Sequence, residues 1–156
     1  GDRLGYRQVI SGHVFREMAK ELGMSLEEFG KLAEQDPRFD HQIDERLLNV
    51  ARGGGDLILE GRLAGQLLRR NDIPAFCIFL DAPPEVRVQR VSGREGVDLQ
   101  AAIEEMRARE ASEVLRYRKF YGIDVTDRSI YDMVIDTGGL TPEQVADSIV
   151  SRVRGV

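Results

Sequence analysis

The sequence contains one cysteine, no tryptophan and only two histidines in 156 residues. The single thiol, Cys77, excludes an internal disulfide, and its place in an apolar run predicts an unreactive core side chain in a reducing, cytoplasmic setting. His13 and His41 have no cysteine or second histidine nearby in the sequence, so a solvated helix surface is the simpler interpretation of both. A metal site formed by Asp40, His41 and Asp44 is the alternative. No Ser/His/Asp or Cys/His pattern indicates nucleophilic catalysis.

The sequence also lacks a basic excess and a long apolar run. Its net charge of -5 argues against a dedicated nucleic-acid-binding protein. The longest apolar run, Ile73–Leu80, contains Pro74 and is too short to span a bilayer, and the polar start shows no signal-peptide pattern. We therefore expect one domain, residues 1–156, that is monomeric and binds neither nucleic acid nor a membrane.

Apolar strands alternate with amphipathic helices along the chain, which predicts a parallel sheet with helices on both faces. Strands are expected at Tyr6–Ile10, Leu57–Glu60, Ala75–Leu80 and Met133–Asp136. The third is continuously apolar, as in a strand covered on both faces. Helices are expected at Val14–Leu22, after a Ser25 capping box, at Phe39–Ala51, at Ala64–Arg70, from Pro84, after Asp98, and from a Thr141 capping box to Val153.

Polar residues follow the strands at the edge where open parallel sheets bind ligands. They are Ser11-Gly12, Glu60-Gly61-Arg62, Asp81 and Asp136-Thr137. Glu60 could hold a magnesium-bound water and Arg62 a phosphate, although a surface ion pair explains these two residues equally well.

The segment Arg87–Tyr121 carries seven arginines, whose planar guanidinium groups fit phosphate oxygens. Arg109 and Arg116 share one helix face, and Arg90 and Arg94 share another near a Gly93/Gly96 break. The apolar spacing lapses from residue 107 to 113, which predicts that the helix is not packed there. The segment is therefore either a mobile lid that binds phosphate or a solvated helix surface.

The order of the motifs resembles that of the archaeal-type cytidylate kinases, which are small P-loop nucleoside monophosphate kinases. The resemblance runs from Leu4 onward and is most specific at 116–132. It rests on Ser-Gly-x-x-Phe-Arg-Glu at 11–17, Gly-Met-Ser-Leu-Glu-Glu-Phe-Gly-Lys at 23–31, Ile-Asp at 43–44, Leu-Glu-Gly-Arg-Leu-Ala-Gly at 59–65, Leu-Asp-Ala-Pro at 80–83, Arg-Glu-Gly at 94–96, Arg-Tyr-x-x-x-Tyr-Gly-Ile-Asp at 116–124 and Ser-Ile-Tyr-Asp at 129–132.

The resemblance implies an α/β, three-layer P-loop NTPase-like fold of strand order 2-3-1-4-5, with NMP-binding helices at about 12–52 and a lid at about 87–121. It implies phosphoryl transfer from ATP to CMP or dCMP with Mg²⁺. Arg16 and Arg62 would bind the acceptor's phosphate. The remaining implied roles are the acceptor pocket for Ser11, Gly12, Asp44 and Gly61, hydrated magnesium for Glu60, the base side of ATP for Arg90, and the transferring phosphoryl group for Arg94, Arg109 and Arg116.

Two features depart from that family. His13 stands where a small polar or acidic residue is usual, and no Gly-x-x-x-x-Gly-Lys-[Ser/Thr] motif occurs. We expect an upstream segment of roughly 20–30 residues, the size of a strand–loop–helix unit, to carry the P-loop and the central strand. These 156 residues alone are expected to be inactive. The alternatives are a kinase for AMP, UMP or a shikimate-like acceptor, and a non-catalytic nucleotide-binding remnant.

Overall fold

The computed structural model describes residues 2–155, which form two compact units. Unit 1 comprises residues 1–76 and 112–130, and unit 2 comprises residues 77–111 and 131–156. Each unit contains two parallel strands and several helices.

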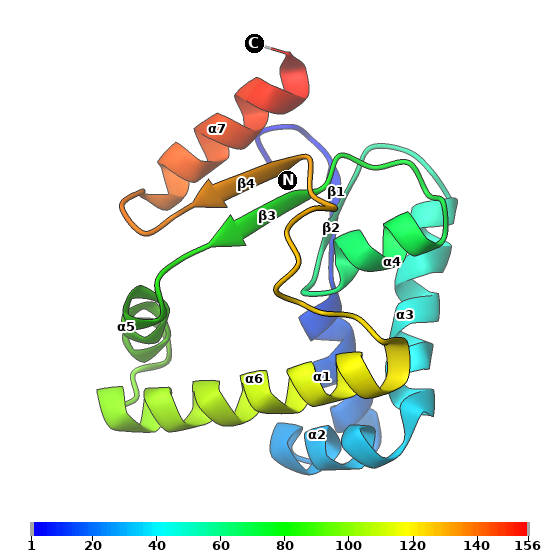
Figure 1. Cartoon of the computed structure of the whole chain (residues 1–156), viewed down its shortest axis with the longest axis vertical. Helices are drawn as coiled ribbons and strands as arrows, with labels where there is room; N and C mark the ends of the chain where they lie inside the picture. The colour runs from blue at the N-terminus through cyan, green and yellow to red at the C-terminus, as the bar shows by residue number, and fades with distance from the viewer. Residues whose placement is uncertain (1, 156) are drawn as a thin grey trace. The chain divides into compact units, whose positions relative to one another are not determined.

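Unit 1 is built on two neighbouring parallel strands, β1 (Arg7–Ile10) and β2 (Leu57–Glu60). Their register pairs Ile10 with Glu60, so that both strands end at the same edge. Four complete helices complete this unit: α1 (Ser11–Glu21), α2 (Leu26–Gln35), α3 (Pro37–Arg52) and α4 (Ala64–Arg70). Helix α1 begins directly after β1, without an intervening loop (Figure 1).

Side-chain caps fix where α2 and α3 begin. The Ser25 hydroxyl accepts a hydrogen bond from the Glu28 amide at 3.1 Å, as the capping box predicts. Asp36 accepts from the Arg38 amide at 3.0 Å, and Pro37 occupies the first turn of α3. The Asp36-Pro37 pair therefore ends α2 and also starts α3, two residues before the predicted start, because proline fits the first helical turn.

An aromatic cluster lies in one of two hydrophobic clusters of unit 1, between α1, α2 and α3. Phe29 is fully buried, and its ring lies 4.5 Å from that of Phe15 and 5.3 Å from that of Phe39, measured between centroids. Met18, Ile43 and Leu47 belong to the same core. Phe29 and Ala33 form the buried face of α2, whereas Leu26 remains 48% exposed at the start of the helix.

Unit 2 contains a second parallel pair, β3 (Ile78–Asp81) and β4 (Met133–Asp136), which Figure 1 shows side by side. Its helices are α5 (Pro84–Glu95) and α7 (Pro142–Arg154). The predicted Thr141 capping box is present, with the side chain and the backbone of Thr141 both bonded to Gln144. Helix α6 (Leu99–Tyr121), capped by Asp98, contributes residues 99–111 to unit 2 and residues 112–121 to unit 1.

Two predictions in unit 2 are wrong in detail. The third strand starts at Ile78 rather than Ala75, because the backbone of Cys77 bonds to Asp132, and Leu80 is 52% exposed rather than covered. Among the described residues, β3 pairs with β4 alone, so that only one of its edges has a neighbouring strand. Helix α5 also runs through Gly93 and ends only at Gly96, whose φ of 65° is left-handed.

The sheet topology agrees in part with the predicted fold. Both pairs are parallel. If β1, β2, β3 and β4 correspond to strands 2, 3, 4 and 5 of the expected order 2-3-1-4-5, each observed pair joins two strands that are neighbours in that order. Residues 2–155 therefore form an α/β fold with small parallel sheets, and the complete strand order stays a prediction. The predicted core position of Cys77 is confirmed, since its side chain is buried.

Candidate functional site

The carboxyl ends of β1 and β2 bring together Ser11, Gly61 and Arg62. A Cβ atom added to Gly61 would overlap the Ser11 hydroxyl and lie 2.9 Å from the Ser11 Cβ, so that only glycine fits where β2 approaches the start of α1. The residue before α1 is Ile10, which provides no side-chain cap. The first amides of α1, at Ser11 and Gly12, are therefore available to bind an anion.

Arg62 lies at this edge and forms an ion pair with Glu113 of α6. The side chain of Arg62 is 46% exposed, whereas that of Glu113 is only 13% exposed. Glu113 Oε2 contacts Nη1 as an ion pair without forming a hydrogen bond, and within residues 2–155 no hydrogen bond of Arg62 is found. Arg62 therefore presents the edge formed by Nε and Nη2, which is suited to bidentate binding of phosphate.

Arg116, three residues further along α6, has a different environment. Its Nε donates to Asp40 Oδ2 at 3.0 Å, its Nη1 donates to Ser112 Oγ at 2.8 Å, and both charged side chains are less than 10% exposed. The aromatic rings of Phe15 and Tyr117 each lie 5.8 Å from the Arg116 guanidinium carbon. Arg116 therefore joins α1, α3 and α6 inside unit 1, and its predicted contact with the transferring phosphoryl group stays a prediction.

Asp44 lies one turn after Asp40 on α3 and accepts a hydrogen bond from the Tyr121 hydroxyl. Burial raises the pKa of Asp44 to about 7, and the negative charges of Asp40 and Glu45 add to this increase. Burial also raises the pKa of Asp40, although Arg116 opposes the shift. The predicted place of Asp44 in the acceptor pocket stays a prediction.

Tyr117 is the residue around which these charges gather. Burial raises the pKa of its hydroxyl, and the charges of Glu113, Arg116, Arg62 and Asp40 all act on it. The two arginines are each matched with a carboxylate close to this ring. Unit 1 thus contains a compact polar cluster, which we define as Asp40, Arg62, Glu113, Arg116 and Tyr117.

Glu60, the predicted magnesium residue, lies exposed at the end of β2 and accepts from Gln8 Nε2 at 3.2 Å. Within residues 2–155, no group of three or more His, Cys, Asp or Glu side chains could hold a metal ion. The alternative of a metal site at Asp40, His41 and Asp44 therefore finds no support. One exposed carboxylate still fits Mg²⁺, which keeps several waters and binds through few protein ligands together with substrate phosphates.

In unit 2, the ends of β3 and β4 form a second polar site around Arg90. Arg90 Nη1 donates to Thr137 Oγ1 at 2.9 Å and Nη2 donates to the Thr137 carbonyl at 2.6 Å. The Thr137 hydroxyl donates in turn to the Asp81 carbonyl at 2.8 Å. Arg90 therefore lies against the loop that follows β4, at the predicted ligand edge of the sheet.

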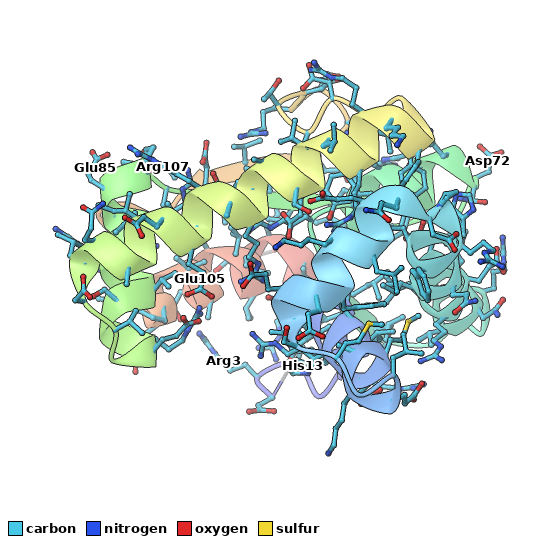
Figure 2. The ribbon with its side chains drawn as sticks, turned by 90° about the horizontal axis from the view of Figure 1, so that it is seen from below. Arg3, His13, Asp72, Glu85, Glu105 and Arg107 are labelled. Carbon is cyan, nitrogen blue, oxygen red and sulfur yellow. The ribbon has the colours of Figure 1, made fainter. Side chains whose placement is uncertain are left out.

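The other predicted arginines are exposed on their helices. Arg94 donates to its neighbour Glu95 at 3.3 Å on α5, Arg109 lies on the unit 2 part of α6, and Arg16 lies on α1 in unit 1. Figure 2 labels Glu105 and Arg107 in the same part of α6, and both are exposed. The predicted loss of packing in α6 is therefore confirmed at 107–109, but it is wrong at Glu113, which the ion pair with Arg62 buries.

Four residues of these sites were not predicted as specific site residues. Glu113 and Tyr117 had no assigned role, Thr137 was placed only among the polar residues at the strand ends, and Asp40 was considered only as a metal ligand. The spacing offered a signal for two of them, because Glu113 lies three residues before Arg116 on α6, and Asp40 lies four residues before Asp44 on α3, so each pair shares a helix face.

Comparisons with known proteins extend over nearly all of these elements. Residues 1–139 match the Cytidylate kinase-like family. The chain is 46% identical to the cytidylate kinase of Methanocaldococcus jannaschii, over 97% of this chain and 85% of that protein. It is 44% identical to the cytidylate kinase of Pyrococcus horikoshii, over 92% of this chain and 73% of that protein.

A solved structure has the same fold. An uncharacterized protein from Eubacterium ventriosum superposes with a TM-score of 0.69 at 18% identity, over 99% of this chain and 87% of that one. Of the helices described here, none combines the length and the apolar character needed to cross a membrane. The match to the family over 139 residues, together with the high identity to two of its archaeal kinases, shows that the chain belongs to the cytidylate kinase-like family.

Proposed function

We propose that this protein transfers a phosphoryl group from ATP to CMP or dCMP, giving ADP and CDP or dCDP. An oxygen of the acceptor's phosphate attacks the γ-phosphorus, and the bond from that phosphorus to the β,γ-bridging oxygen breaks. The two archaeal relatives named cytidylate kinase support this reaction. The observation that carries the acceptor site is the open Nε/Nη2 edge of Arg62 beside the uncapped start of α1.

Each residue has a proposed role that follows from its place in the fold. Arg62 and the amides at Ser11 and Gly12 would hold the acceptor's phosphate, with Arg16 one turn further along α1. Arg90 would lie at the base end of ATP, against Thr137. Arg94 and Arg109 would neutralise charge on the transferred group, which is the main task of a protein in this chemistry.

Mg²⁺ is the cofactor that the family implies. Glu60 would hold one of its water molecules, and the ion would neutralise charge on the phosphates of ATP. We further propose a cytoplasmic, monomeric enzyme whose partners are small nucleotides.

An assay of ADP release tests the function. The protein from its complete reading frame is mixed with ATP, Mg²⁺ and one acceptor from CMP, dCMP, UMP, AMP or shikimate. The highest kcat/KM is expected with CMP or dCMP, and a preference for another acceptor would contradict the proposal. The 156 residues alone are expected to bind CMP without turnover, because they lack the lysine and glycines of a P-loop.

A further inference from the structure

The contact between Arg62 and Glu113 has two features that set it apart from an ordinary surface ion pair. The carboxylate belongs to α6 and is largely buried, whereas the arginine belongs to the turn after β2 and is about half exposed. An exposed pair would leave both side chains mobile and would contribute little. Here the carboxylate is largely buried, so that the exposed arginine is paired with a group that has little room to move.

The geometry of the contact leaves Arg62 able to bind a ligand. A guanidinium group binds an oxyanion in bidentate fashion through Nε and Nη2, and Glu113 contacts the third nitrogen, Nη1. Asp40 instead occupies Nε of Arg116, so this edge is already engaged there. Of the two arginines in the polar cluster, Arg62 is thus the one whose Nη1 contacts a carboxylate while its Nε/Nη2 edge remains open.

We propose that Glu113 is a positioning residue for the acceptor's phosphate: it holds Arg62 through Nη1 and thereby directs the Nε/Nη2 edge toward the anion beside Ser11 and Gly61. The inference deepens the proposed function and rests on it. An arginine side chain has several rotatable bonds, and fixing it before the ligand arrives reduces the entropy lost on binding.

A competing role for Glu113 predicts the opposite result. A carboxylate that merely neutralised Arg62 would have to be displaced by phosphate, and its removal would then tighten CMP binding. The two roles are separated by Glu113→Ala, which removes the contact, and by Glu113→Gln, which keeps an oxygen that can accept from Nη1 but removes the charge.

The test compares the dissociation constants of CMP and cytidine by calorimetry, using the protein from its complete reading frame. The dissociation constant of cytidine divided by that of CMP reports the contribution of the phosphate to binding. A general loss of structure would weaken both ligands and would not change this ratio selectively. Glu113→Ala is expected to reduce this ratio about tenfold, because Arg62 loses the buried charge that holds it. Glu113→Gln is expected to remain within about threefold of the wild type, since its amide oxygen can still contact Nη1 and accept a hydrogen bond from it.

Two further variants keep the result interpretable. Glu110→Ala is the matched control, because Glu110 lies on the same helix and forms an ion pair with another arginine, Arg87 of α5; the ratio is expected to stay unchanged. In an Arg62→Ala background, Glu113→Ala is expected to cause no further change in this ratio, because the proposed effect of Glu113 on the acceptor's phosphate requires Arg62.

The outcomes distinguish this inference from the function beneath it. A wild-type protein that binds CMP no more tightly than cytidine would overturn both. A wild-type protein that prefers CMP, with a Glu113→Ala variant of equal or greater preference, would overturn the role of Glu113 and leave the function standing. An equal loss in Glu110→Ala, or a further loss in the Arg62→Ala background, would also overturn it. Circular dichroism establishes that each variant is folded.

Discussion

Two arginine–carboxylate pairs lie three residues apart along α6, and they have opposite characters. Arg116 and Asp40 are both less than 10% exposed, and Ser112 takes a second nitrogen of the guanidinium group. In the other pair, Arg62 is 46% exposed and has its bidentate edge open. The same chemical pair therefore joins helices in one place and leaves a guanidinium edge exposed in the next, where we propose that it binds the acceptor's phosphate. Burial and the choice of nitrogen, rather than residue type, separate the two roles.

The largest effect is expected from breaking the buried pair. Asp40→Ala leaves the Arg116 charge buried without its carboxylate, which should lower the free energy of unfolding by about 3–5 kcal/mol. Urea denaturation followed by circular dichroism measures this change. The double variant Asp40→Leu/Arg116→Met removes both charges and should recover much of the loss. A loss below about 1 kcal/mol in the single variant would show that the pair does not support the fold.

Changing the exposed arginine should affect binding rather than stability. Arg62→Lys keeps a positive charge beside Glu113 but loses the planar, bidentate edge. In the protein from its complete reading frame, we expect the KM for CMP to rise about 30-fold, equivalent to ~2 kcal/mol, with the free energy of unfolding changed by less than ~0.5 kcal/mol. If stability fell and KM stayed constant, Arg62 would be a structural residue like Arg116.

The pH dependence of stability should reveal the second carboxylate of α3. The pKa of Asp44 is raised to about 7 from an ordinary 3.8, so its neutral form is favoured in the folded state. Protonated Asp44 therefore adds to the free energy of unfolding. This contribution is fully present below about pH 4 and is lost as the pH rises toward 7, by roughly 1–2 kcal/mol once the partial exposure of the side chain is allowed for. Urea denaturation from pH 4 to 8 should show this decline in the wild type.

Asp44→Asn is the variant that isolates this titration. It cannot ionise but can still accept from the Tyr121 hydroxyl, so the decline should be reduced. A smaller decline in the same direction should remain, because the pKa of Asp40 is also raised. An unchanged decline would show that another group is responsible.

The smallest effect is expected from Ser25→Ala, which serves as a control for a general loss of stability. Ser25→Ala removes the cap of α2, far along the chain from both arginines, and should lower the free energy of unfolding by about 1 kcal/mol. The KM for CMP should not change. If it did rise, a modest general loss of stability would be enough to disturb binding, and the interpretation of Arg62→Lys would need correction.

Local patterns predicted the elements well because local chemistry decides them. Leu57–Glu60 and Met133–Asp136 have the predicted bounds, and the Ser25, Asp98 and Thr141 caps depend on atoms within three residues of each cap. The resemblance to the family was confirmed over most of the chain.

Long-range partners could not be predicted in the same way. Asp40 and Arg116 are 76 positions apart, and Arg62 and Glu113 are also distant in sequence, so no spacing rule connects them. A lapse in the apolar pattern of α6 was interpreted as an unpacked helix, because hydrophobic periodicity does not register burial by ion pairs. Polar residues that recur on one helix face within such a lapse deserve to be considered as a buried polar cluster.

The close approach of Gly61 to Ser11 restricts how the proposed acceptor site can be altered by evolution or design. Every side chain larger than hydrogen at position 61 would push the start of α1 away from the end of β2. A change in acceptor specificity must therefore come from substitutions at neighbouring positions, while residue 61 remains glycine. A library that randomised the strand end would recover glycine at this position whatever acceptor it was selected for.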